Sequence, residues 1–210
     1  MGRKIRDNKN SDSNSKSITQ KSRSIFKWII MIIILILFLL LIAIFLWGNR
    51  SKVGKAPQLN GLMPVQNFDI QKYVGTWFEQ ARVDYSFEKG LSQVTANYGI
   101  LQNGLIQVLN TGHEKNNKIA ISQGSARTTD IPGVLLVSFF PFIEAPYIVL
   151  YVDDQYTTAV VGSSTNMKYL WLLTRNNIVQ QTQLDTLKSV AKQNGYSDTI
   201  IQQMVFANNK

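Results

Sequence analysis

After Pro64, short runs of β-forming residues alternate with turn residues at intervals of roughly 8–12 residues. This rhythm is typical of an antiparallel sandwich or barrel. Turn chemistry supports the divisions, because Gln102-Asn103-Gly104 is suited to a tight hairpin and the stretch 129–133 to a longer turn. We therefore predict eight strands, at 77–85, 93–101, 105–112, 118–126, 134–140, 147–152, 157–162 and 168–174.

A helix is expected after the strands, between Thr182, which can cap its start, and Gly195, which can end it. Four apolar residues fall on one face of that helix, namely Leu184, Leu187, Val190 and Ala191. A last strand is expected over 199–206. Such an all-β chain, with eight up-and-down strands and one C-terminal helix, can close into an antiparallel barrel without exposed edges. A barrel of eight strands has room for one small ligand.

A second feature is an apolar run in which every residue from Ile29 to Trp47 is hydrophobic. About 19 residues at about 1.5 Å rise nearly match a hydrocarbon core of about 30 Å, so residues 26–47 are predicted to be a transmembrane anchor. The Ser-, Asn- and Lys-rich residues 1–25 are expected to be a disordered arm. Residues 48–64, with their Gly and Pro, are expected to be a flexible linker, and residues 65–210 to be the barrel domain.

The positive charge is heavier before the apolar run than after it, which predicts that the N-terminus is cytoplasmic. The barrel would then lie on the exported side, periplasmic or extracellular. A cleaved signal peptide is the alternative, although the run is long for one and Phe45-Leu46-Trp47 offers no cleavage site of small residues.

The net charge of +9 is confined to the N-terminal part of the chain. Of the 22 Lys and Arg residues, eleven precede Ala56, whereas only two of the 13 Asp and Glu residues do. The remainder is formally neutral, so we expect no nucleic-acid partner.

The sequence contains no cysteine and one histidine, His113. The absence of cysteine excludes disulfides, thiolate metal sites, cysteine nucleophiles and acylation of a lipoprotein signal. A single histidine leaves at most one base for a catalytic relay. We therefore expect neither a metal nor a cofactor.

Three groups of residues resemble the signatures of the lipocalin family. Gly75-Thr76-Trp77 begins the first strand, after Asn67-Phe68-Asp69, where the family closes its barrel floor with a short 3₁₀ turn. The run from Val152 to Val160 resembles the family's Thr-Asp-centred loop, with Val152 in place of the threonine. Arg175 matches the arginine that lies across the tryptophan of the first strand. Gly75, Trp77 and Arg175 are thus predicted to be structural residues of the closed end.

Phe87-Glu88-Lys89-Gly90-Leu91 and Val137-Ser138-Phe139-Phe140 are similar to the bacterial lipocalin and apolipoprotein D subgroup. This resemblance implies binding, storage or transport of fatty acids or lysophospholipids, in the service of membrane maintenance and without catalysis. The bacterial members are usually outer-membrane lipoproteins. The missing anchoring cysteine therefore argues against outer-membrane residence here.

The resemblance to apolipoprotein D also predicts a ligand pocket lined by Tyr98, Asn110, Tyr147 and Trp171. Alternation along the strands adds five residues to the same interior: Ala96, Val108, Val149, Tyr169 and Leu173. Glu79 is expected to point inward by parity with Trp77, with a satisfied carboxylate near the floor as the alternative. An apolar lining with a few polar atoms suits an amphiphile.

Strand direction places the loop at residues 141–146 beside the open end, with Phe140, Phe142 and Ile143 as apolar side chains near solvent. Exposed apolar clusters usually mark interaction sites. We expect these three residues to contact a membrane, with the contact surface of a homodimer as the alternative.

Two other functions stay open at the level of sequence. A lipid-acting enzyme of this fold would need converging catalytic groups, and only His113 and Glu114 are candidates. A ligand-free barrel could instead serve as a structural or interaction module.

Overall fold

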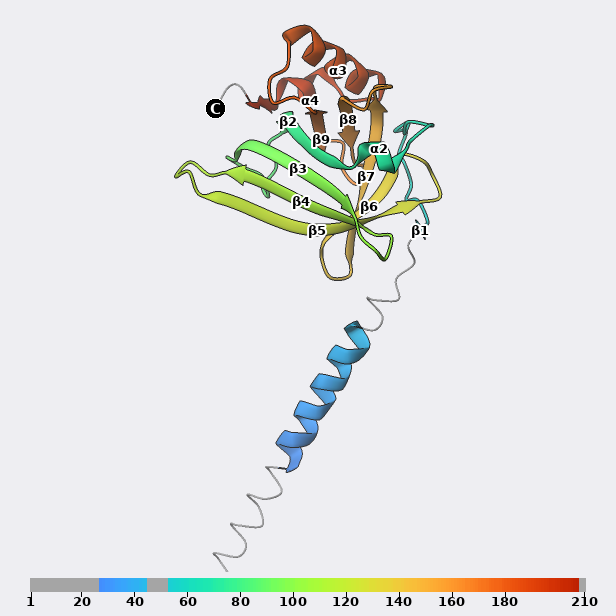
Figure 1. Cartoon of the computed structure of the whole chain (residues 1–210), viewed down its shortest axis with the longest axis vertical. Helices are drawn as coiled ribbons and strands as arrows, with labels where there is room; N and C mark the ends of the chain where they lie inside the picture. Colours follow the sequence, from blue (N-terminus) through green and yellow to red (C-terminus); the bar gives the residue numbers. More distant parts are fainter. Residues whose placement is uncertain (1–26, 45–52, 208–210) are drawn as a thin grey trace, which may run out of the picture. The chain divides into compact units, whose positions relative to one another are not determined.

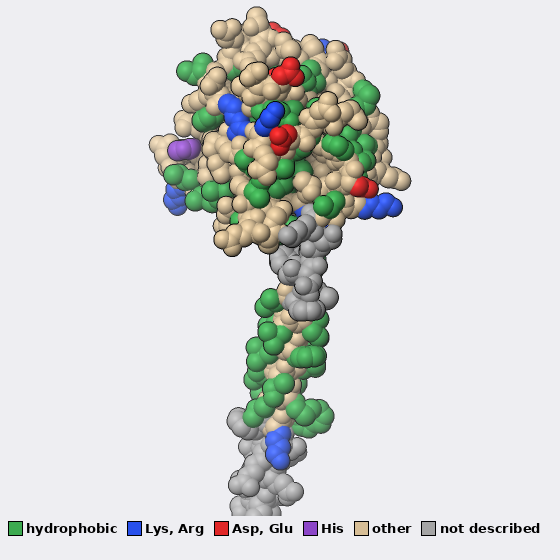
Figure 2. All heavy atoms as spheres, turned by 45° about the vertical axis from the view of Figure 1, so that its right-hand side comes forward, with side chains coloured by type: hydrophobic (Ala, Val, Ile, Leu, Met, Phe, Trp, Pro, Cys, Tyr) green, Lys and Arg blue, Asp and Glu red, His purple; other side chains and the backbone are tan. Residues whose placement is uncertain are grey.

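The structure of the protein is a computed structural model that describes residues 27–44 and 53–207. The expected cytoplasmic arm, residues 1–25, and the ends of the predicted anchor, residue 26 and residues 45–47, lie outside the described residues. The chain divides into two units, Met1–Arg50 and Ser51–Lys210. In the first unit a helix runs from Lys27 to Ile44, and every residue after Lys27 is apolar; Figure 2 shows one face of this helix. Its length and composition suit a membrane-spanning helix.

The second unit is built around the predicted eight-stranded antiparallel barrel (Figure 1). Each strand pairs with the next along the chain, and the last strand pairs with the first, which closes the barrel. The strands are β2 Gly75–Val83, β3 Ser92–Ile100, β4 Ile106–His113, β5 Ile119–Thr129, β6 Val134–Phe140, β7 Ile143–Val152, β8 Thr158–Gly162 and β9 Leu170–Thr174.

Two short strands and three helices complete the unit. Strand β1, Val53–Gly54, pairs in parallel with β5, and β10, Met204–Phe206, pairs antiparallel with β2. The helices are α2 Ile70–Tyr73, α3 Gln181–Gln193 and α4 Asp198–Gln202. Helix α3 lies outside the barrel and contacts β7, β8 and β9.

Side chains of β7, β8 and β9 alternate between two apolar clusters. Val149, Val161 and Leu173 face the barrel interior. Their neighbours Ile148, Val160 and Leu172 face outward and pack with Leu184 and Leu187 of α3. The helix therefore covers strands whose outer faces are as apolar as their inner ones.

The end of the predicted strand pattern needs correction. Only Met204–Phe206 of the expected strand 199–206 is extended, because Ser197 caps the short helix α4 by accepting a hydrogen bond from the backbone nitrogen of Ile200 at 3.3 Å. Helix α3 starts after Gln180 without a side-chain cap, so Thr182 does not have the capping role expected for it. Gly195, with a φ of +87°, follows the C-cap as predicted.

The expected loop over 141–146 is also shorter, because β7 begins at Ile143 and pairs with Phe140. Pro146 is tolerated within β7 because pairing with β8 begins only at Ile148, which leaves β7 with one neighbouring strand at Pro146.

The expected flexible linker does not extend to residue 64. The backbone nitrogen of Ala56 donates to Asp130 Oδ1 at 2.7 Å, and Met63 donates to Asn194 Oδ1 at 3.2 Å. Leu62 is only 3% exposed and belongs to the cluster beneath α3. The burial of Leu62 and the pairing of β1 hold residues 53–64 against the barrel. Residues 48–52 lie outside the described residues.

Candidate functional site

The closed end of the barrel is formed by helix α2. Asp69 caps this helix, since its Oδ1 accepts a hydrogen bond from the backbone nitrogen of Gln71 at 2.8 Å. Tyr73 and Val74 donate to carbonyls four residues earlier, each at 3.1 Å. The turn is therefore of the α type rather than the 3₁₀ type expected from the family. The indole nitrogen of Trp77 donates to the carbonyl of Tyr73 at 2.8 Å, which fixes the strand to the helix.

Arg175 lies over the ring of Trp77, with its guanidinium carbon 3.9 Å from the ring centroid. Its Nη2 donates to the carbonyl oxygens of Lys72, Tyr73 and Val74 at the end of α2. The side chain thus joins α2 to the barrel. Burial lowers the pKa of Arg175.

Gly75 is required at this junction. Its φ of +96° is rare for residues with a side chain, and an added Cβ would lie 3.2 Å from Arg175 Nη1.

Eight of the nine residues expected to line a pocket lie along the interior of the barrel, whereas Tyr169 lies just before β9, beside the mouth loop. Tyr98, Val108, Val149 and Leu173 are buried in one inner cluster, against which Ala96, Tyr147 and Trp171 pack. Asn110 pairs directly with Ala96 on the neighbouring strand. The ring of Tyr169 stacks on Trp171 at a centroid distance of 5.9 Å.

Burial is graded along this interior. Inward-facing residues near the closed end are buried, among them Trp77, Tyr98 and Val149. Towards the other end Asn110 and Trp171 are partly exposed, and Ser122 is exposed. The barrel is therefore packed at its floor and opens to solvent at its mouth.

Three tyrosines of the interior form a hydrogen-bonded group. Tyr98 Oη donates to Tyr147 Oη at 2.9 Å, and the hydroxyls of Tyr73 and Tyr147 lie 2.7 Å apart. Burial disfavours the phenolate and raises the pKa of each, so all three are neutral. The three hydroxyl groups have three hydrogens but form only two hydrogen bonds with one another. Whichever way these bonds point, one hydroxyl hydrogen therefore has no acceptor among the described contacts.

Asn110 supplies an acceptor in the same interior. Its Oδ1 is buried and receives no hydrogen bond from the described residues. The interior therefore offers both a donor and an acceptor between apolar walls.

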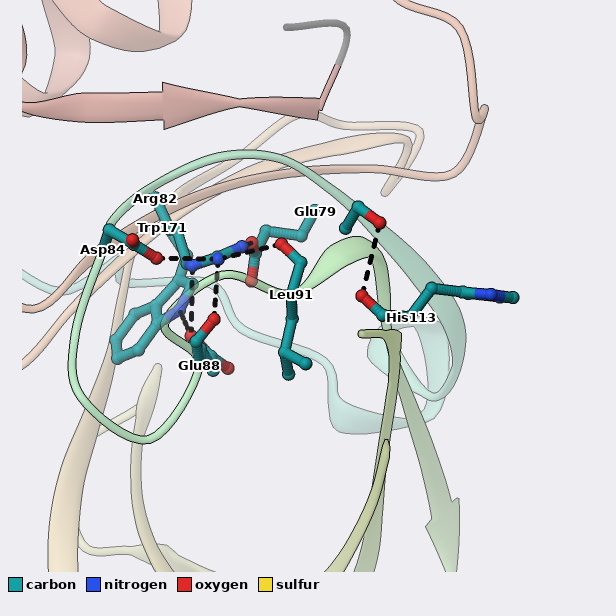
Figure 3. A network of polar contacts seen from close by, with 8 residues as sticks. Glu79, Arg82, Asp84, Glu88, Leu91, His113 and Trp171 are labelled. Atoms are coloured by element: carbon teal, nitrogen blue, oxygen red, sulfur yellow. Dashed lines mark hydrogen bonds and ion pairs between the residues drawn. The ribbon is translucent and has the colours of Figure 1, made fainter. Parts of the chain in front are cut away.

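A buried charged group lies above this interior, where β2 approaches the mouth (Figure 3). Arg82, which is 2% exposed, forms ion pairs with Glu79 at 2.5 Å and with Glu88 at 3.9 Å. It also pairs with Asp84 at 2.8 Å and donates to the backbone carbonyls of Glu88 and Leu91. Burial alone would lower the pKa of Arg82. The negative charge of Glu79 and the hydrogen bond to it, together with the contacts to Asp84 and Glu88, outweigh burial, so the pKa of Arg82 is raised.

The inward position of Arg82 was not anticipated from the sequence. Strict alternation from Trp77 brings Glu79 and then Ala81 inside. The structure has a bulge between Glu79 and Ala81, after which Arg82 faces Trp171. A bulge shifts the parity of every later residue, and no residue type marks it here.

Side-chain contacts also join the mouth loop 84–91 to Trp171 of β9 and to Tyr169, which precedes that strand. Trp171 donates from Nε1 to Glu88 Oε2 at 3.0 Å. The ring of Tyr169 lies tilted by 38° against the ring of Tyr85, with centroids 4.1 Å apart, and the centroid of the Phe87 ring lies 6.0 Å from that of Tyr169. These contacts border the entrance to the barrel.

The candidate catalytic pair is not directed at this interior. His113 ends β4, where its carbonyl accepts a hydrogen bond from Ser92 Oγ at 3.3 Å. Its imidazole points away from the carboxylates around Arg82 (Figure 3). Glu114 begins the exposed turn that follows.

A separate hollow of about 710 Å³ lies at the closed end, between the segment 65–72 and the loop 152–156. None of the nine expected lining residues borders it. We therefore place the candidate site inside the barrel rather than in this hollow. At the mouth, Phe140, Phe142 and Ile143 are all strongly exposed.

Comparison with known proteins finds one matching family model and several related proteins. The family model of the lipocalin-like domain matches residues 68–205. The outer membrane lipoprotein Blc of Vibrio cholerae is 39% identical over 138 residues, covering 63% of this chain and 80% of the relative. Apolipoprotein D of Mus musculus is 33% identical over 157 residues, covering 70% of this chain and 80% of the relative.

Among solved structures, insecticyanin from Manduca sexta aligns with a TM-score of 0.55 at 17% identity, over 73% of this chain and 86% of that one. At this identity the likeness concerns the fold alone. The matched family model, the identities above 30% and the closed barrel with its capped floor agree, and the chain belongs to the lipocalin family.

Proposed function

We propose that this protein binds one amphiphilic lipid, a fatty acid or a lysophospholipid, in the interior of its barrel, and that it holds or transfers this lipid at a membrane. The observation that carries the proposal is the pair of unused polar groups in the interior. One tyrosine hydrogen and Asn110 Oδ1 lack partners among the described residues. Buried polar groups without partners cost about 1–3 kcal/mol each, and a ligand's polar atoms would remove that cost.

The walls around these atoms suit the rest of an amphiphile. Val108, Val149 and Leu173 are buried and apolar, and Trp171 presents a partly exposed ring nearer the mouth. An acyl chain between such walls would leave water at a gain of about 0.8 kcal/mol per CH₂. The relative from Mus musculus is by name an apolipoprotein, which supports a lipid as the ligand class.

The N-terminal helix supports a membrane location. Its apolar surface from Lys27 to Ile44 suits an anchor. We propose that the N-terminus is cytoplasmic and the barrel exported, because the Lys and Arg residues concentrate before the helix. Lipid maintenance of that membrane would be the role of a barrel held at its surface. We propose no catalytic step, because the imidazole of His113 is directed away from the interior.

The test is a titration of the delipidated unit Ser51–Lys210 with a lysophospholipid and with a long-chain fatty acid, followed by tryptophan fluorescence. This unit contains two tryptophans. Trp77 is fully buried beneath Arg175 and gives a constant background, whereas Trp171 reports the mouth half. We expect saturation at about one ligand per barrel.

Two variants sharpen the result. Trp171→Phe keeps an apolar ring and should remove the signal while a calorimetric titration still shows binding. Trp171→Ala should weaken binding itself. A flat response to every amphiphile, with no heat of binding, would overturn the proposal in favour of a barrel filled by its own side chains.

A further inference from the structure

Exposed apolar side chains gather on one side of the barrel, at the mouth end of β5 and the turn between β6 and β7. We call this set the β5–β7 face. Its members are between 60% and 68% exposed: Ile119, Ile121, Phe140, Phe142 and Ile143. The last three were expected at the mouth from sequence, and the structure adds the two isoleucines of β5.

Strand pairing places the two parts of this face on neighbouring strands of the barrel. Ser125 of β5 pairs with Ser138 of β6, and a Cβ at Gly124 would lie 2.8 Å from the ring of Phe139. β6 therefore stays against β5 up to that point. An irregularity in β6 lies between Val137 and Phe140, after which Phe140, Phe142 and Ile143 follow at the turn that ends this strand.

The same strand carries the point at which the chain enters the barrel. At the opposite end of β5, Val53 of β1 pairs with Thr128. Only residues 48–52 separate Val53 from Trp47, the end of the apolar run. Even a fully extended chain of that length reaches about 20 Å.

The length of this connection limits the orientations in which the barrel can contact a bilayer. From Thr128 to Ile119 the strand advances by nine residue steps, or about 30 Å. A barrel standing upright on its mouth would require the short connection to span that distance, which it cannot. A barrel lying with β5 along the surface requires much less.

Charges on this side suit an anionic lipid surface. Lys115 and Lys118 are exposed beside Ile119, and Lys55 is exposed next to β1. Arg127 is paired with Glu144 at 2.8 Å. The acidic residues nearest the two ends of β5 are Glu114 and Asp130, so basic residues outnumber acidic ones at these ends.

We propose that the barrel docks on its side against the bilayer that anchors the chain, with the β5–β7 face in the headgroup region. The mouth rim at Phe142 and Ile143 then opens at the lipid surface, so an amphiphile can pass between bilayer and barrel without crossing bulk water. The inference extends the proposed function, but docking is measured independently of ligand binding.

The test uses the full chain, which contains no cysteine, so one introduced cysteine gives a unique label. The labelled positions are Ile121→Cys and Phe142→Cys, with Ile178→Cys as the control. Ile178 is 84% exposed and follows β9, which is four strands from β5 in either direction around the barrel. Each protein is reconstituted into vesicles of phosphatidylethanolamine and phosphatidylglycerol. An environment-sensitive fluorophore is then quenched by nitroxide lipids or by aqueous iodide.

Labels at 121 and 142 should be quenched by the nitroxide lipids and shielded from iodide, whereas the label at 178 should show the reverse. A label at Ile119→Cys should lose its lipid quenching when Ile121→Ser and Phe142→Ser are added, because two apolar side chains shift the docking equilibrium on the order of 100-fold. Adding Ile178→Ser should not change it.

Equal iodide access at all three positions would overturn the proposal. Shielding from iodide without nitroxide quenching, increasing with protein density in the vesicle, would also overturn it and assign the face to a second copy of the chain. If docking fails while Trp171 still reports saturable lipid binding, only the docking inference is lost.

Discussion

Replacing Arg82 by methionine should destabilise the barrel strongly at neutral pH. The guanidinium is almost completely buried and lies between the carboxylates of Glu79 and Glu88, with a third pair to Asp84. Methionine fills much of the volume but leaves carboxylates in the interior without their counter-ion. Breaking a buried ion pair in this way costs about 3–5 kcal/mol. Urea unfolding of the unit Ser51–Lys210, followed by circular dichroism, measures the loss.

The deficit should also depend on pH. Without Arg82, burial raises the folded-state pKa of Glu79 and Glu88 above the unfolded value of about 4.3. A carboxyl group whose pKa is higher in the folded than in the unfolded state does not reduce the free energy of unfolding at a pH below the unfolded-state pKa. The reduction develops as the pH rises through the folded-state pKa. The difference in unfolding free energy between Arg82→Met and the wild type should therefore be smallest near pH about 4.

Two controls separate charge from packing. Arg82→Lys keeps a positive charge and should lose less stability. Adding Glu79→Gln and Glu88→Gln to Arg82→Met should recover part of the loss, since no buried charge then lacks a partner. A pH-independent deficit, or a triple variant no more stable than Arg82→Met, would refute the electrostatic reasoning.

Three further substitutions test other parts of the structure. Leu62→Ala should reduce the free energy of unfolding by about 2–5 kcal/mol, because it empties a buried site between the segment 53–64 and α3; a loss close to zero would show that this segment is not held. Gly75→Ala should cost about 1–3 kcal/mol through its positive φ and its approach to Arg175, again by urea unfolding. Asn110→Leu should raise the unfolding free energy of the lipid-free protein by about 1 kcal/mol and weaken lipid binding about fivefold, since a buried acceptor without a partner disappears. If calorimetric titration finds unchanged affinity in Asn110→Leu, this amide does not contact the ligand.

Most strands of the barrel could be predicted from the sequence, because residues with specific turn chemistry lie between them. Gly104, with a φ of +79°, ends the hairpin between β3 and β4, and Gly133, with a φ of +74°, precedes β6. Such positions are visible in a sequence because glycine is the residue that adopts them readily. The inward side of β3 and β4 also followed from alternation, because those strands run without a bulge from Thr95 to Ile100.

The features that were not foreseen depend on contacts between distant residues. The segment 53–64 reads as a linker by composition, and its packing depends on where Leu62 meets α3. Arg82 reads as an outward residue until the bulge after Glu79 is known. The helical start of the last segment depends on one cap, Ser197, in a stretch whose Ile200 and Ile201 favour a strand.

The central claim is that the interior of this barrel holds one amphiphile. It is tested most directly by mass spectrometry of the purified protein, first as isolated, with its extracted lipids identified, and then after delipidation and reloading with a lysophospholipid. The account predicts a single class of amphiphile at about one molecule per chain, and a reloaded complex of the same stoichiometry that Asn110→Leu and Trp171→Ala weaken. Protein that carries no lipid as isolated and takes up none on reloading, while remaining folded, would contradict it.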